Sequence, residues 1–347
     1  MRTRNRAIDI LKVIGIFTIM LSHSQGMPYE VNYFRNYEVI LLVMVSGMLY
    51  KDFDQESISF AYIKKRLSRI VIPTWAFLLI FFALLSIASA LLHIPFPYST
   101  RDIIESFTMT NGIGYVWIML VYCFIAIGLP LIWIQYNKAQ KTNRRVWFVV
   151  CVAAIWIVYE ALRWRLDGTS ANYLPAYIFK NTVMYFVAYS IIAWLGSYLG
   201  KKRAIISLWI GIALTGIHFA IIGHITTVRP QVILLSTMKY PPSLVYVLYG
   251  MGVSLIIIAC VRLLCGNDAT KSKILAFISK ESQWVYFNHI YMVFIWNQII
   301  GKENWVFSFF FYAIGSILLT WAQTTVIKRL FGKQTDSLSQ FVLRTFC

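Results

Sequence analysis

Residues 8–24 read IDILKVIGIFTIMLSHS, and this stretch decides the class of fold. It is nearly as long as the roughly 20 apolar residues that an α-helix needs to cross a membrane. Yet it holds Lys12 near one end and His23 near the other. An ionisable group inside a membrane costs about 2.5 kcal/mol or more on insertion scales, so each needs a partner or a purpose. The stretch therefore predicts a transmembrane helix that carries polar groups of its own.

The rest of the chain has the same apolar character. Of its 347 residues, 59% are hydrophobic and 13% are charged, and the mean hydropathy is +0.65. Soluble proteins carry about 25% charged residues, so a soluble enzyme, a disordered protein and a nucleic-acid-binding domain are excluded. The apolar runs are continuous rather than alternating, which favours helices over a β-barrel. We predict an all-α integral membrane protein, a bundle of about ten transmembrane helices near 7–24, 38–50, 70–93, 114–136, 146–163, 177–199, 204–224, 243–264, 282–300 and 304–327.

The basic residues predict the orientation of this bundle. The chain has 32 Lys and Arg against 14 Asp and Glu, a net charge of +18. With a cytoplasmic N-terminus, 23 of these basic residues fall in inner segments and eight in outer segments. Basic residues accumulate on the cytoplasmic side of membrane proteins. Both termini are therefore expected in the cytoplasm, with a single transmembrane domain over 1–335 and a short cytoplasmic tail over 336–347.

Lys12 and His23 are the first candidate functional residues. They are 11 positions apart, close to three helical turns, so they share a face and lie about 16 Å apart along the axis. From the spacing alone two interpretations stay open. Lys12 either reaches toward the cytoplasm and His23 forms interfacial hydrogen bonds, or both line a functional path.

Arg66 and Arg69 are the second candidates, in the basic run Lys64-Lys65-Arg66-Leu67-Ser68-Arg69 before the third span. Three positions apart, they face the same way if the segment is helical. Paired guanidinium groups suit phosphate or pyrophosphate. The alternative is an anchor that contacts anionic lipid.

The ninth span supplies a third set. Ser282, Tyr286 and His289 are spaced i, i+4 and i+7 and so lie on one helix face. Such a polar stripe either packs against other helices or lines a cavity. Trp117 is read as interface packing or a cavity wall, and Ser46-Gly47 as a close helix contact. The spacing of His, Cys and carboxylate residues matches no recognisable metal site.

Together these features resemble the membrane acyltransferase-3 family, bacterial enzymes that acylate cell-surface glycans. The stretches that carry the resemblance are Ile8-Asp9-Ile10-Leu11-Lys12 with Gly15 and His23, Val45-Ser46-Gly47, Lys65 to Ile70 with Pro73, Gly114-Tyr115-Val116-Trp117, and Ser282 through Tyr286 to His289. Their order and spacing match from about residue 6 to residue 330. Two positions depart from the family pattern. Lys12 stands where the family often has Arg, and Met44-Val45 replaces the usual pair of aromatic residues before Ser-Gly.

The resemblance implies a membrane O-acyltransferase in a bacterial cytoplasmic membrane. It would move an acyl group, with acetyl the first expectation, from cytoplasmic acyl-CoA to a hydroxyl of an extracytoplasmic glycan such as O-antigen, capsule or exopolysaccharide. It implies His23 as the catalytic residue and Lys12, Arg66 and Arg69 as the coenzyme site. Ser282, His289 and Trp117 are expected to contact the acceptor. Acetyl-CoA, or another acyl-CoA, would serve as donor, with no permanently bound cofactor or metal and no nucleic-acid partner.

Two other functions use the same residues. An exporter or flippase of a lipid-linked polysaccharide precursor would line its path with them and would not require coenzyme A. The other function, that of a membrane signalling or interaction protein, does not explain why the first span contains Lys12 and His23. For the enzyme, the sequence leaves open whether His23 acts as a general base or forms a covalent acyl-imidazole.

Overall fold

The computed structural model describes residues 4–50, 58–167, 174–200, 202–228, 234–266, 268–301, 304–334 and 336–347. Five of the basic residues counted for the orientation lie outside these ranges: Arg2, Lys51, Lys201, Arg229 and Lys302. The predicted domain boundary at 335 lies outside them too.

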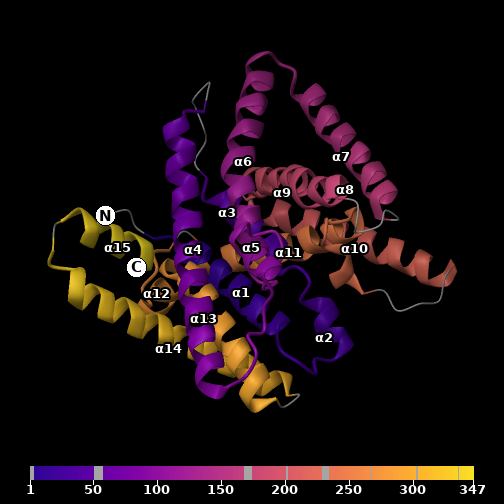
Figure 1. The fold of residues 1–347 in the computed structure, drawn as a ribbon. Coiled ribbons are helices and arrows are strands. Elements are labelled where there is room, and N and C mark those ends of the chain that lie inside the picture. The colour runs from indigo at the N-terminus through magenta and orange to yellow at the C-terminus, as the bar shows by residue number, and fades with distance from the viewer. Residues whose placement is uncertain are drawn as a thin grey trace. The chain divides into compact units, whose positions relative to one another are not determined.

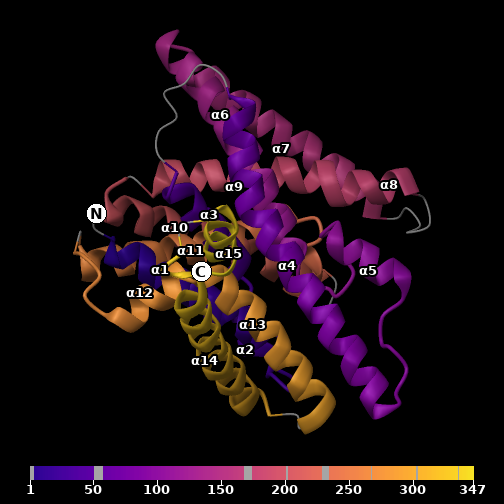
Figure 2. The ribbon, with the colours of Figure 1, turned by 60° about the vertical axis from the view of Figure 1, so that its left-hand side comes forward.

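The chain forms two compact units, and each is described by itself. The first unit comprises Met1–Gly15, Tyr29–Ile63 and Phe124–Ala269, and the second comprises Ile16–Pro28, Lys64–Cys123 and Thr270–Cys347. Helices α1 (Arg6–Ser22), α4 (Phe60–Leu92) and α6 (Trp117–Lys141) contribute residues to both units. Figure 1 and Figure 2 show the ribbon from two sides.

The first unit is built around three helices, α3 (Glu38–Met48), α9 (Tyr185–Leu199) and α11 (Leu244–Cys265). Its other elements are α2 (Tyr29–Phe34), α7 (Arg145–Asp167), α8 (Leu174–Phe179), the π-helical turn η1 (Lys180–Met184), α10 (Ala204–Val228) and the 3₁₀ turn η2 (Leu235–Met238). Helix α3 packs on α9 and α11, and α10 packs along α11. Ser243 begins α11, where its hydroxyl accepts a hydrogen bond from the backbone N–H of Tyr246 at 3.2 Å. This cap fixes where the chain enters α11.

The second unit is built around α13 (Ser282–Ile295) and α14 (Trp305–Phe331), which lie side by side in Figure 2. Its other elements are α5 (Thr100–Phe107), α12 (Lys273–Lys280), the π-helical turn η3 (Trp296–Ile300) and α15 (Ser337–Phe346). Helix α15, which covers the expected tail, packs against α14, and the Trp284 indole N–H donates to the Thr345 carbonyl at 2.8 Å. The division into one domain and a tail stays a prediction.

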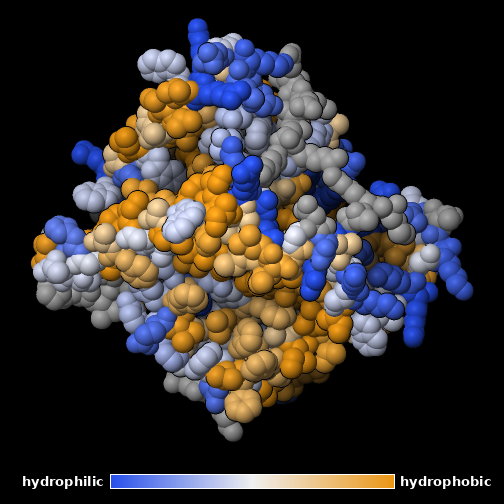
Figure 3. Space-filling model, turned by 180° about the vertical axis from the view of Figure 1, so that it is seen from behind, coloured by the Kyte–Doolittle hydropathy of each residue, from blue (hydrophilic) through white to orange (hydrophobic). Residues whose placement is uncertain are grey.

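Seven of the described helices are long and apolar enough to cross a membrane: α4, α6, α7, the α8–α9 segment, α10, α11 and α14. The other three predicted spans coincide with shorter helices, α1, α3 and α13. Apolar side chains cover much of the surface in Figure 3, and α7 alone exposes Trp147 by 69% and Ile157 by 70%. Apolar surfaces of this extent require a lipid environment. The protein is thus an all-α membrane protein, whereas the count of ten spans and the cytoplasmic termini stay predictions.

The close helix contact predicted at Ser46-Gly47 is confirmed. A Cβ built at Gly47 of α3 would overlap the backbone carbonyl group of Ala193 in α9. In return, Gly196 of α9 faces the backbone of Met44, where a Cβ would lie 2.5 Å from its Cα. Two backbones in such contact leave room only for glycine.

Replacing Gly47 with alanine is therefore expected to destabilise the protein by about 1–3 kcal/mol or more, because the new methyl group meets backbone that cannot move aside. Thermal unfolding in detergent measures this. Gly216 in α10 is the matched control, since no atom lies within 4 Å of a Cβ built there. Equal unfolding temperatures for Gly47→Ala and Gly216→Ala would contradict the proposed contact.

Candidate functional site

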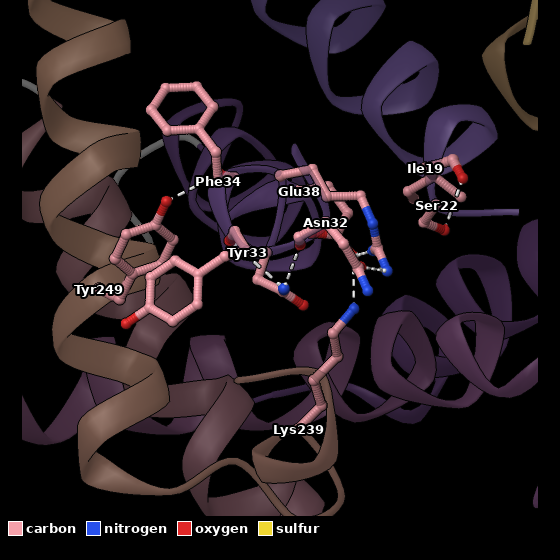
Figure 4. A network of polar contacts seen from close by, with 10 residues as sticks. Ile19, Ser22, Asn32, Tyr33, Phe34, Glu38, Lys239 and Tyr249 are labelled. Carbon is pink, nitrogen blue, oxygen red and sulfur yellow. Dashed lines mark hydrogen bonds and ion pairs between the residues drawn. The ribbon is translucent and has the colours of Figure 1, made fainter. Parts of the chain in front are cut away.

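His23 lies directly after the last residue of α1, in the second unit. In the last turn of the helix the Ser22 hydroxyl donates to the Ile19 carbonyl at 2.6 Å, as Figure 4 shows. The His23 N–H donates to the Met20 carbonyl at 3.1 Å in a closing turn. The closing turn fixes the backbone at His23. Its side chain is half-buried, so the imidazole is partly accessible.

Two rings of the same unit lie beside the His23 imidazole. The Tyr115 ring meets it edge-on with centroids 4.7 Å apart, and the His289 ring stacks near it at 5.4 Å with 27° between the planes. The Tyr115 and His289 rings are 6.4 Å apart. We call His23, Tyr115 and His289 the ring cluster. Residues from three distant parts of the chain thus converge on one histidine.

His289 is the buried member of the ring cluster, with 0% of its surface exposed. Its Nδ1 lies in hydrogen-bond contact with the Tyr286 carbonyl oxygen. A carbonyl only accepts hydrogen bonds, so Nδ1 is the donor, and Nε2 of the neutral ring is then an acceptor. Among the described residues, Nε2 has no hydrogen-bond partner. Buried polar atoms are rarely left unpaired unless a ligand or water uses them.

The turn before α6 positions Tyr115. Gly112 adopts a positive φ of 60°, and a Cβ there would overlap the backbone N of Ser106 in α5. The Ser106 hydroxyl accepts a hydrogen bond from the Ile113 N–H at 2.9 Å. The Tyr286 hydroxyl donates to the Tyr115 carbonyl. Helices α5 and α13 therefore hold this turn from two sides.

Helix α13 is itself fixed to α14. The Asn288 side-chain amide donates to the Thr320 hydroxyl at 2.9 Å and to the side-chain Oε1 of Gln323 at 3.2 Å. Asn288 is thus a helix-packing residue. Asn288 stands beside the predicted stripe of Ser282, Tyr286 and His289, and whether that stripe packs or lines a cavity stays a prediction.

The arginine pair lies at the start of α4, and both side chains are exposed. The segment is helical, as the same-face interpretation requires. Helix α4 and helix α13 run in the same direction. The Gln283 side chain donates to the Ile70 carbonyl at 3.3 Å, and Phe77 stacks on Phe287 at 4.8 Å further along both helices. His289 therefore lies about 9 Å further along α13 than Gln283, the residue that contacts α4 next to Arg69.

The remaining predicted residues are Ser282, Trp117 and Lys12. Ser282 is the half-buried first residue of α13, seven positions before His289, which is about 10 Å along the helix. Trp117 is the half-buried first residue of α6, two positions after Tyr115. Lys12 is half-buried in the part of α1 that belongs to the first unit.

Two features of the second unit were not predicted as site residues. Tyr115 stands in the Gly114-Tyr115-Val116-Trp117 stretch, of which the sequence predicts only Trp117 as a site residue. Tyr286 was placed on the polar face, but its bond to the Tyr115 carbonyl depends on a turn 171 positions away. The local sequence signal for this turn is the pair Gly112 and Gly114, both of which adopt a positive φ.

Comparison with known proteins identifies the family. A family model described as an acyltransferase domain matches residues 5–324 of the 347. No curated protein and no solved structure matches the chain. The match includes every residue of the ring cluster and the arginine pair. The chain belongs to the acyltransferase-3 family and is a multi-pass membrane acyltransferase.

Proposed function

We propose that this protein moves an acyl group, acetyl in the first instance, from cytoplasmic acyl-CoA to a hydroxyl of an extracytoplasmic glycan. The membrane would be the bacterial cytoplasmic membrane, and O-antigen, capsule and exopolysaccharide are the acceptor candidates. The observation that carries this proposal is the half-buried His23 with the rings of half-buried Tyr115 and fully buried His289 beside it, in a chain of the acyltransferase-3 family.

In the first of two proposed routes, His23 acts as the general base. Its imidazole takes the proton of the acceptor hydroxyl, and the oxygen attacks the carbonyl carbon of the thioester. The new C–O bond forms as the C–S bond breaks, and the coenzyme leaves as a thiol with the proton that His23 returns. Histidine suits this role because its ordinary pKa is near 6.5. Such assistance contributes typically 10²–10⁴-fold to the rate.

A covalent route needs the same residue. In that version His23 attacks the thioester, carries the acyl group on an imidazole nitrogen and passes it to the acceptor hydroxyl. The two routes differ in whether an acyl-histidine accumulates when the donor is present and the acceptor is withheld.

His289 is proposed to bind the acceptor. Because its Nδ1 is committed to the Tyr286 carbonyl, its Nε2 is held as an acceptor within the ring cluster. An acceptor nitrogen of this kind can receive a hydrogen bond from a second sugar hydroxyl and so orient the reacting one. Ser282 and Trp117 are proposed as further acceptor contacts, Trp117 through its place two positions after Tyr115.

The donor is proposed to bind by its phosphates at Arg66 and Arg69. Both guanidinium groups are exposed at the start of α4, and α13 runs alongside α4 from that end toward His289. A coenzyme that starts at the arginine pair and extends along these helices would bring its thioester toward the ring cluster. Lys12 is proposed as a further contact of the coenzyme, as the family resemblance implies.

Replacing Arg66 or Arg69 with alanine is expected to raise the apparent KM for acyl-CoA about tenfold or more, with little change in kcat. The reason is that a charge-assisted hydrogen bond contributes about 1.5–3 kcal/mol to binding. Initial rates against donor concentration measure this. Lys64→Ala and Lys65→Ala are the matched controls, since both are exposed cations in the same helix. The same KM in all four variants and the wild type would favour the lipid-anchor interpretation.

The proposed function is tested with the purified protein in detergent. Its thermal stability is compared with added acetyl-CoA, with free coenzyme A and with a lipid-linked glycan. We expect stabilisation by acetyl-CoA, and transfer of a labelled acetyl group from it to an added glycan. Stabilisation by the lipid-linked glycan, with none by acetyl-CoA and no transfer, would contradict the proposal in favour of an exporter.

A further inference from the structure

A buried cluster of charges lies in the first unit, where α2 meets α3. The Lys239 Nζ is 2.5 Å from Oε1 of Glu38, and the Arg35 Nη1 is 3.3 Å from the same oxygen (Figure 4). The exposed fraction is 8% for Arg35, 1% for Glu38 and 5% for Lys239. Two cations thus share one carboxylate oxygen away from solvent. We call these three residues the charged cluster.

The charged cluster holds two cations, Arg35 and Lys239, and one carboxylate, Glu38, so it has an excess of one positive charge. Burial lowers the pKa of Lys239, and the Glu38 carboxylate raises it again in part. A second anion beside the cations would offset the remaining cost of burial.

Four polar atoms in and around the charged cluster are buried and have no hydrogen-bond partner among the described residues. They are the Arg35 Nε, the Glu38 Oε2, the Asn36 Oδ1 and the Tyr246 hydroxyl. Tyr246 lies in the first turn of α11, which is joined to the turn that holds Lys239: the Tyr246 N–H donates to the Ser243 hydroxyl at 3.2 Å, and the Ser243 N–H donates to the Met238 carbonyl at 2.9 Å. An unsatisfied buried polar group costs about 1–3 kcal/mol. Open donors and acceptors of this kind are suited to a ligand that offers both.

We infer that the charged cluster binds an acidic sugar, with the sugar carboxylate at Arg35 and Lys239 and adjacent sugar hydroxyls at Glu38 and Tyr246. The inference rests on the proposed function, because it specifies the acceptor glycan. The excess of one charge decides between anions. A carboxylate balances it, whereas a phosphate monoester carries about −1.5 to −2 near neutral pH and would repel the Glu38 carboxylate.

Two further observations fit a sugar. The segments that supply the charged cluster, near 25–37 and 225–242, are those whose charge pattern predicts an extracytoplasmic position, the side of the acceptor. The neighbours of the charged cluster are less buried than its members: half-buried Asn32 accepts from the Arg35 Nη2 at 2.5 Å, and Tyr240, which follows Lys239, is 44% exposed.

The test measures binding to the purified full-length protein by isothermal titration calorimetry, without acyl-CoA. The probes are D-glucuronate and D-galacturonate, with D-glucose, the methyl ester of glucuronate, acetate and inorganic phosphate for comparison. We expect at least one uronate to bind at least tenfold more tightly than glucose, the methyl ester, acetate or phosphate. Equal binding of a uronate and acetate, preference for phosphate, or no uronate binding would each overturn the inference.

Two variants locate the bound sugar. Tyr246→Phe removes only a hydroxyl without a described partner, so the fold is expected to persist while the uronate Kd rises at least threefold. Tyr312→Phe, at a buried tyrosine of the second unit, is the matched control and should leave the Kd unchanged. Identical Kd values in both variants would overturn the assignment to the charged cluster. Acyl transfer from acetyl-CoA to a neutral glycan is measured in parallel. If uronate binding fails while this transfer persists, only the acidic-sugar inference fails.

Discussion

Replacing His23 with alanine is expected to abolish acyl transfer while leaving the protein folded and inserted. The reason is that no neighbouring group in the ring cluster can take over its role. The open Nε2 of His289 is assigned to a second sugar hydroxyl and its ring is fully buried, and Tyr115 carries a phenol, a side chain that keeps its proton near neutral pH. Loss of a general base lowers the rate by about 10²–10⁴-fold. Loss of a covalent acyl carrier removes the route altogether.

The measurement is the rate of labelled acetyl transfer from acetyl-CoA by the purified variant. His224→Ala is the matched control, because His224 is an exposed histidine in α10 of the first unit. It should keep the wild-type rate. Full activity of His23→Ala would remove His23 from the mechanism. Mass spectrometry of wild-type protein given donor alone distinguishes the two routes, since only the covalent one leaves an acyl group on His23.

Replacing Glu38 with glutamine is expected to destabilise the protein by about 3–5 kcal/mol, because it leaves the buried Arg35 and Lys239 without the carboxylate that both contact. The loss also depends on pH. Burial already lowers the pKa of Lys239 in the folded state, and removing Glu38 lowers it further. The unfolded chain then binds more protons than the folded one, so the stability of the variant rises as the pH approaches the ordinary lysine value of about 10.4.

Unfolding by denaturant in detergent micelles, followed at two pH values, measures both effects. Glu105→Gln is the matched control. It breaks the Arg101–Glu105 pair, in which the arginine is 79% exposed, and an exposed pair contributes only about 0–1 kcal/mol. Equal stability losses in the two variants would show that the charged cluster is not a buried ion pair in the native protein.

Most of the fold could be predicted from the sequence. Each of the ten predicted spans coincides with a described helix, because hydropathy over about 20 residues reports directly on membrane burial. The extents differ where polar residues continue a helix beyond the apolar run. Helix α4 begins at Phe60 rather than near residue 70, since Lys64 to Arg69 are good helix formers that do not register as apolar. This extension places the arginine pair on the helix.

The site was only partly predictable. Spacing gives the face of a helix on which His289 lies, but not which other residue that face meets. The stacking of His289 near His23 depends on how α13 packs on its neighbours. The charged cluster could not be predicted, because Glu38 and Lys239 are 201 positions apart. In the sequence, Arg35 and Lys239 are recognisable only as basic residues of predicted outer segments.

The most direct test of the central claim is mass spectrometry of the cell-surface glycans of the native host. It would compare the wild-type strain, a deletion strain, and the deletion strain complemented with His23→Ala or with His224→Ala. We predict that the acetyl groups of one glycan disappear in the deletion strain and in the His23→Ala strain, and return with His224→Ala. If acetylation persists in the deletion strain, or if the whole glycan is lost from the surface while its precursors accumulate inside, the proposal of a glycan acyltransferase centred on His23 is contradicted.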